Sequence, residues 1–103
     1  MKKIFISQPM KDKTDEAILA EREKAIEFAK KSLESLGEEF EVIDSFFKGA
    51  PADAKPLWYL GESLKLLADA DVAVFTHGWK DARGCKIEHI CAEEYGIKFI
   101  GEM

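Results

Sequence analysis

Glu88 is the residue whose type and position best suit chemistry. It lies one helical turn after Gly84, in a segment (residues 70–96) that predicts a buried strand, a polar and aromatic loop, and a helix. Free backbone amides at a helix N-terminus favour negative charge, so we expect a lowered pKa that keeps this carboxylate ionised as a nucleophile or base. The alternative interpretation is a surface glutamate that only stabilises the start of the helix.

The loop before this helix offers groups for an anion and for a flat ring. Lys80, Arg83 and the amides around Gly84 form a candidate anion site, or else the two side chains are solvated loop charges. Trp79 lies in the same loop, so we expect an exposed indole that covers a ring, a sugar or the surface of a partner.

Cys85 and His89 have the i, i+4 spacing of a metal-ligand pair, or of a cysteine nucleophile with its base. No second paired Cys or His motif accompanies them, and no third orienting group is evident, so we expect neither a metal nor a cofactor. Cys85 and Cys91 lie on one expected helix, which does not suit a disulfide. Free thiols in a reducing, cytoplasmic compartment are therefore expected.

The elements that position these residues alternate between strand and helix. Short apolar runs at residues 3–7, 39–43, 72–75 and 98–100 predict strands, and three segments with apolar residues at helical spacing lie between them. This order predicts one α/β domain over residues 1–103. We expect a three-layer sandwich with a four-stranded parallel sheet, flavodoxin-like or Rossmann-like, in the order 2-1-3-4.

The helix boundaries and buried faces follow from the same pattern. Thr14 is a candidate N-cap, Gly37 a stop signal, and Pro56 a first helical residue, while Trp58 and Tyr59 are expected to pack or to form an interface. The expected buried stripes are Ile18, Ala25, Ile26, Ala29, Leu33 and Leu36 in the first helix, Leu57, Leu60, Leu64 and Leu67 in the second, and Ile87, Ile90, Cys91 and Tyr95 in the third.

The loops after the first and third strands should face each other across one crevice, because the predicted strand order reverses between these strands. Phe46 and its neighbour Phe47 are either a hydrophobic plug or a wall for a flat ligand. The candidate residues of this crevice are Ser7, Gln8, Pro9, Met10, Asp44, Phe46, His77, Gly78, Trp79, Lys80, Arg83, Gly84 and Glu88.

Composition excludes several classes of function. A net charge of -5 argues against binding a nucleic-acid polymer, which requires a dense basic surface. The chain has neither the G-x-G-x-x-G dinucleotide motif nor the Walker A motif, and no apolar run reaches the length of a membrane span. We expect no membrane association.

Two stretches, IFISQPMKDKTDEAIL and LLADADVAVFTHGWKDARGCKIEHICAEEYGI, resemble the nucleoside 2-deoxyribosyltransferase-like superfamily. Within it, the chain is most similar to short bacterial and phage proteins of the DUF4406 type. The resemblance implies that Glu88 is a nucleophile that attacks the anomeric carbon of a (deoxy)nucleoside or nucleotide, with departure of the base through an oxocarbenium-like transition state.

Three positions depart from the pattern of the active enzymes. A tyrosine of the first strand is replaced by Phe5, an aspartate that handles the proton of the leaving base by Ser63, and a phosphate-binding serine by Ala82. Glu62, Asp44 or Asp81 are candidates to replace that aspartate, and Ser63 itself remains a candidate binding residue.

Three functional hypotheses follow. The first is a transferase or hydrolase of N-glycosidic bonds, with Glu88 as nucleophile and Asp44 or Asp81 as a sugar or proton partner. The second is a non-catalytic nucleotide or nucleotide-sugar binding module, motivated by Phe5 and Ser63. The third is an interaction protein. The resemblance implies a homo-oligomer and a nucleoside or nucleotide as small-molecule partner.

Overall fold

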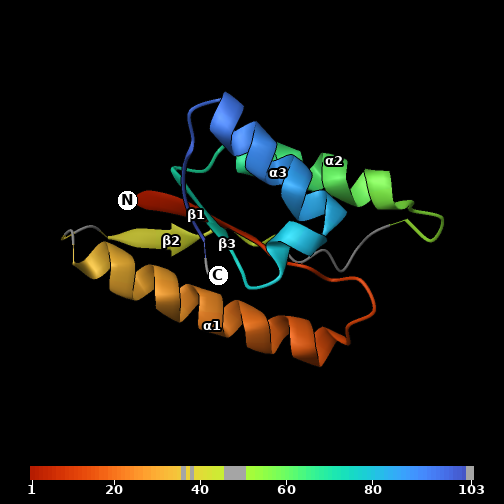
Figure 1. Cartoon of the computed structure of the whole chain (residues 1–103), viewed down its shortest axis with the longest axis horizontal. Coiled ribbons are helices and arrows are strands. Elements are labelled where there is room, and N and C mark those ends of the chain that lie inside the picture. Colours follow the sequence, from red (N-terminus) through yellow and green to blue (C-terminus); the bar gives the residue numbers. More distant parts are fainter. Residues whose placement is uncertain (36, 38, 46–50, 102–103) are drawn as a thin grey trace.

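Strands and helices alternate along the chain in this computed structural model, which describes residues 1–35, 37, 39–45 and 51–101 (Figure 1). The elements are β1 (Lys2–Ser7), α1 (Asp15–Glu34), β2 (Phe40–Val42), α2 (Pro56–Leu67), β3 (Val72–Phe75), a short 3-10 helix η1 (Trp79–Asp81), α3 (Arg83–Glu94) and β4 (Lys98–Gly101). The four strands form a parallel sheet in the order β2-β1-β3-β4. The predicted fold class and strand order are confirmed.

The helices cover the sheet from both sides. In Figure 1, α1 lies along one face, and α2 and α3 lie together on the other. A first apolar cluster joins alternate residues of β1 and β3, such as Ile6 and Val74, to α1. A second cluster joins the intervening residues, such as Phe5 and Phe75, to α2 and α3. Because strand side chains alternate between faces, each cluster receives every second residue of both strands.

Local sequence signals set the ends of the helices. The Thr14 hydroxyl accepts a hydrogen bond from the Ala17 amide (3.1 Å), which confirms the predicted N-cap of α1. Pro56 is the first residue of α2, where its missing N–H costs nothing. Gly37 follows α1 with a left-handed φ of 70°, a conformation that glycine adopts without strain.

Two of the predicted buried stripes need correction. Leu57 is 74% exposed, so the buried face of α2 includes Leu67 but not its first leucine. Ile90 of α3 and Tyr95, the C-cap of this helix, are exposed at 59% and 83%. The buried residues of α3 are Cys85, Glu88 and Ala92. Periodicity alone favoured the larger apolar residues, whereas the helix presents its small residues and one carboxylate to the sheet.

Four residues of the predicted α1 stripe are buried, namely Ile18, Ala25, Ala29 and Leu33, and Ile26 is half-buried against the same cluster. Leu36 lies outside the described residues. Arg22 also lies on this buried face and was not predicted there. Among the described residues, no helix is both long enough and apolar enough to cross a membrane.

Candidate functional site

A buried carboxylate lies where β1 ends. Ser7, the last residue of β1, donates its hydroxyl to Glu88 Oε1 at 2.7 Å. The Ser63 side chain from α2 also favours the ionised form of this carboxylate and so lowers its pKa. Glu88 is 6% exposed and Ser7 is 2% exposed. The Glu88 site (Ser7, Ser63 and Glu88) therefore combines one strand and two helices that are distant in sequence.

Burial, rather than the helix terminus, dominates the ionisation of Glu88. Loss of solvent raises the pKa of this carboxyl from 4.5 to about 7, and the hydrogen bonds from Ser7 and Ser63 oppose this rise. The predicted lowering of the pKa is wrong. The physical reason is that α3 begins at Arg83, so Glu88 lies more than one turn into the helix, against the sheet and away from the free amides.

Cys85 adjoins the same group of hydroxyls but is unsuited to nucleophilic chemistry. The pKa of its thiol is raised to about 11, chiefly by burial, with a further rise from Glu88; a hydrogen bond with Ser7 and the charge of Lys13 act in the opposite direction. A thiol nucleophile requires a lowered pKa. Both cysteines are free thiols, as predicted.

The loops that follow β1 and β3 meet beside this carboxylate. A Cβ atom built on Gly78 would lie 3.8 Å from Pro9 Cγ, and Gly78 has a left-handed φ of 85°. Ser7 pairs with Phe75 in the sheet, so the two loops leave neighbouring strands side by side. The two loops lie side by side, as predicted, and the crevice between them stays a prediction.

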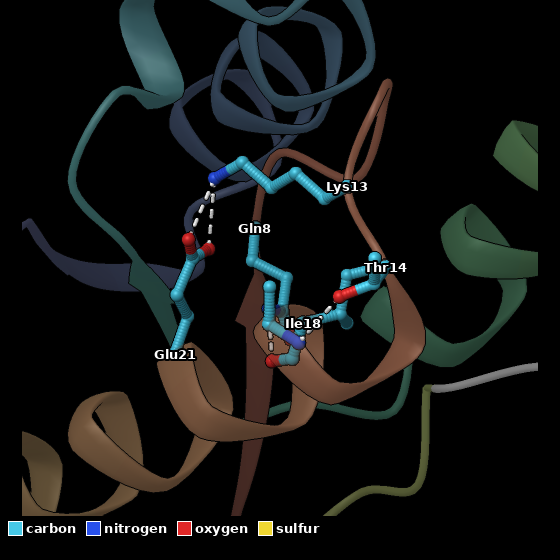
Figure 2. Close-up of polar contacts among 6 residues, drawn as sticks. Gln8, Lys13, Thr14, Ile18 and Glu21 are labelled. Atoms are coloured by element: carbon cyan, nitrogen blue, oxygen red, sulfur yellow. Dashed lines mark hydrogen bonds and ion pairs between the residues drawn. The ribbon is translucent and has the colours of Figure 1, made fainter.

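The β1–α1 loop is attached to the start of α1 by two side chains (Figure 2). Lys13 Nζ lies 2.8 and 2.9 Å from the two carboxylate oxygens of Glu21. Beneath this ion pair, the Gln8 amide nitrogen donates to the Ile18 carbonyl at 2.9 Å. Gln8 is 6% exposed, so this predicted site residue is buried between the loop and α1.

Arg22 organises the end of β2, and sequence analysis did not identify it. Its guanidinium donates to Ser45 Oγ at 3.0 Å and to the Ile43 carbonyl at 2.7 Å. Burial lowers the pKa of Arg22, and the nearby Asp44 carboxylate opposes this effect. The predicted site residue Asp44 is itself exposed. The sequence signal for a buried Arg22 was its helical spacing with Ile18, Ala25 and Ala29, which puts it on the same face of α1.

Trp79 is covered by the protein, which corrects the prediction of an exposed indole. Its ring stacks on His89 at 4.3 Å with an interplanar angle of 14° and lies 5.3 Å from the Phe75 ring. The His89 ring also contacts Phe75 and Phe99 edge-on. His89 thus belongs to an aromatic cluster between α3 and the sheet.

The remaining predicted site residues lie at the surface. Lys80 Nζ lies 5.8 Å from the centre of the Trp79 ring. Gly84 is half-buried in the first turn of α3, and Phe46 lies outside the described residues. In the described part of the chain, no three His, Cys, Asp or Glu side chains are grouped as they would be to hold a metal ion. The exposed residues are Met10, His77, Lys80, Asp81 and Arg83.

The fold and the site together define a small parallel α/β protein with a buried, serine-bound carboxylate at the carboxyl edge of its sheet. Residues 2–100 match the family model described as Domain of unknown function (DUF4406), and the chain belongs to this family. The predicted DUF4406 resemblance is confirmed. Comparisons with curated proteins and with solved structures gave no match.

Proposed function

We propose that this protein cleaves or transfers the N-glycosidic bond of a (deoxy)nucleoside or nucleotide, as a member of the nucleoside 2-deoxyribosyltransferase-like superfamily, with Glu88 as nucleophile. The observation that carries this proposal is the buried Glu88 carboxylate, which accepts a hydrogen bond from the Ser7 hydroxyl at the carboxyl edge of the sheet. In open α/β sheets this edge is where ligands bind. A carboxylate oriented by the hydrogen bond from Ser7 is suited to attack one carbon atom of a bound sugar.

The proposed chemistry conserves atoms and charge over two steps. A Glu88 carboxylate oxygen forms a bond to C1′ of the sugar as the C1′–N bond breaks, and the electron pair leaves on the base nitrogen, which takes up a proton. Water or a second base then attacks C1′, releases the carboxylate and returns its proton to the group that protonated the first base. Both steps pass through an oxocarbenium-like transition state, which a nearby negative charge stabilises.

The proton for the leaving base needs a donor. Ser63 lies against Glu88, where the superfamily resemblance implies an aspartate, and a serine hydroxyl is a poorer acid than a carboxyl group. Asp44 or Asp81, both exposed, are the proposed alternative partners. Lys80 and Arg83 are the proposed contacts for an anionic group of the ligand.

Activity should rise with pH if Glu88 is the nucleophile, because only its ionised form attacks. Since the pKa of the buried carboxyl is raised to about 7, kcat/KM should increase as pH rises through neutrality and then level off. A rate that falls through the same range would instead assign Glu88 as a general acid.

The direct test is release of free base from the 2′-deoxynucleosides and their 5′-monophosphates, measured by chromatography. Glu88→Ala should abolish release, and intact-mass analysis of rapidly quenched protein should show one added sugar in the wild type only. Glu94→Ala, an exposed glutamate on the same helix, is the matched control. No base release from any substrate, or full activity in Glu88→Ala, would refute the proposal.

A non-catalytic nucleotide-binding module is the second candidate. Phe5, which replaces the tyrosine of the active enzymes, is 1% exposed and packs in the second apolar cluster. It supplies no hydroxyl to the crevice. Ligand-dependent stabilisation without base release would select this function, since a ligand that binds only the native state raises stability.

A homo-oligomer is the proposed assembly. Leu57 of α2, Ile90 of α3 and Tyr95, the C-cap of α3, are large apolar residues that remain exposed. The two helices pack together on one side of the sheet. Light scattering that gives the mass of one chain would contradict this proposal.

A further inference from the structure

Side chains from β1, α2 and α3 lie in layers that run from the core to the carboxyl edge of the sheet. The core layer consists of Phe5 of β1, Leu67 of α2 and Ala92 of α3, which belong to the second apolar cluster. Each of these residues is at most 2% exposed. The space beneath the Glu88 site is therefore filled.

The Glu88 site forms the next layer on the same face of the sheet. Ser63 and Glu88 each lie four residues before the core residue of their helix, and Ser7 lies two residues after Phe5. Four helical residues advance about 6 Å and two strand residues about 6.6 Å, so the three elements stay level. The 2.7 Å hydrogen bond from Ser7 to Glu88 agrees with this register.

One further helical turn reaches Tyr59 on α2 and Gly84 on α3. These residues lie four positions before Ser63 and Glu88, and residues with this spacing are neighbours on one helix face. Both helices begin at the carboxyl edge of the sheet and pack together (Figure 1). The layer of Tyr59 and Gly84 therefore lies about 6 Å beyond the Glu88 layer, toward solvent.

This outer layer contains open space beside an aromatic ring. A Cβ atom built on Gly84 would have no heavy atom of the described residues within 4 Å. Tyr59 is 40% exposed, and the Trp58 ring contacts its ring edge-on, with 5.1 Å between the ring centroids and an interplanar angle of 86°. The Trp58 contact restricts the orientation of the Tyr59 ring, which leaves a flat wall beside the open space.

We propose that Tyr59 stacks on the nucleobase of the substrate, in the space that Gly84 leaves open. This inference rests on the proposed function of Glu88. An attacking carboxylate approaches C1′ from the side opposite to the leaving base, so the base lies beyond C1′, in the direction of the outer layer. Nucleobases stack on aromatic side chains through their flat faces. Trp79 does not offer such a face, because its ring is stacked on His89.

The test compares a ligand that has a base with one that lacks it. Dissociation constants would be measured by calorimetry, in a Glu88→Gln background that prevents turnover, for the 2′-deoxynucleoside 5′-monophosphates and for 2-deoxyribose 5-phosphate. Tyr59→Leu removes the ring, and Tyr59→Phe keeps it. Tyr95→Leu, at an 83% exposed tyrosine on the C-cap of α3, is the matched control. Gly84→Leu fills the open space and is a second variant for the case that Tyr59→Leu impairs folding.

We expect Tyr59→Leu to weaken nucleotide binding about tenfold, as for loss of one base–aromatic stack, and to leave binding of 2-deoxyribose 5-phosphate unchanged. Gly84→Leu should weaken nucleotide binding at least as much. Tyr59→Phe and Tyr95→Leu should each stay within about twofold of the background protein. If the sugar phosphate does not bind measurably, the difference between Tyr59→Leu and Tyr59→Phe decides.

Equal weakening of both ligands, equal effects of Tyr59→Leu and Tyr59→Phe, or no binding of any nucleotide would overturn the proposal. Nucleotide binding that Gly84→Leu leaves intact would do the same. Light scattering on Tyr59→Leu adds a further check, because a lower oligomeric mass with unchanged nucleotide affinity would assign Tyr59 to an interface between chains and so refute the stacking role.

Base release by the wild-type protein separates this inference from the proposed function. Release together with nucleotide affinity that is insensitive to Tyr59→Leu would leave the role of Glu88 standing and refute the stacking site. Nucleotide binding that depends on the Tyr59 ring, without base release, would do the reverse.

Discussion

Replacement of Glu88 by glutamine should stabilise the protein at alkaline pH and leave its stability unchanged in mild acid. Glutamine keeps the shape and neutrality of the protonated carboxyl group. In the folded protein the pKa of Glu88 is raised from 4.5 to about 7, because the side chain is buried. The folded chain therefore holds this proton more tightly than the unfolded chain does between these two values.

The magnitude follows from the size of the shift. The stabilisation that comes from protonated Glu88 is fully present below the unfolded pKa of 4.5 and is lost as pH rises through about 7. The rise in pKa corresponds to a loss of roughly 3 kcal/mol, since one pKa unit is worth about 1.4 kcal/mol. Glu88→Gln should match the wild type near about pH 4 and exceed it by roughly 3 kcal/mol near about pH 9.

Urea denaturation across this pH range measures the difference in the free energy of unfolding. The difference between Glu88→Gln and the wild type excludes the titration of all other groups, because both proteins contain the same groups. Glu94→Gln controls for the loss of one negative charge from the same helix, at an exposed position. A constant difference between Glu88→Gln and wild type at all pH values would show that Glu88 is solvated, and it would remove the physical basis of the proposed site.

Other substitutions test the supports of the site. Arg22→Met should lower the free energy of unfolding by about 2–3 kcal/mol, because it removes two hydrogen bonds from a buried guanidinium, whereas Lys24→Met on the exposed face should have little effect in the same urea assay. Thr14→Ala should cost about 1 kcal/mol through loss of the N-cap, with Thr14→Ser close to wild type; equal losses in both would contradict the capping role. Cys85, with its pKa raised to about 11, should react with iodoacetamide only as fast as the chain unfolds, and mass spectrometry should find the half-buried Cys91 labelled first.

The layout of the fold was predictable because it depends on patterns that burial imposes on whole segments. Alternation of short apolar runs with helical spacing determines a parallel sheet, and right-handed crossovers then favour the observed strand order. The approach of Pro9 to Gly78 follows from that order, since their loops leave neighbouring strands. Placement of Glu88 near Ser7 was predictable for the same reason.

The details of the site were less predictable because they depend on the rotation of each helix about its axis. The larger apolar residues Ile90 and Tyr95 were expected to face the sheet, but α3 turns Cys85 and Glu88 inward instead. That rotation changes the dominant influence on Glu88 from the helix terminus to loss of solvent, and so reverses the direction of its pKa shift. Arg22 was missed because charge normally indicates an exposed position, while here its head group reaches the end of β2.

The Glu88 site draws one side chain from each of β1, α2 and α3, and none of these elements can hold the carboxylate by itself. A variant in which any one of these elements detaches from the fold would lose the whole site. Loss of the proposed activity in destabilised variants should then track the folded fraction of the population, so that the base release remaining in a mutant library would report the folded fraction as directly as a spectroscopic probe does.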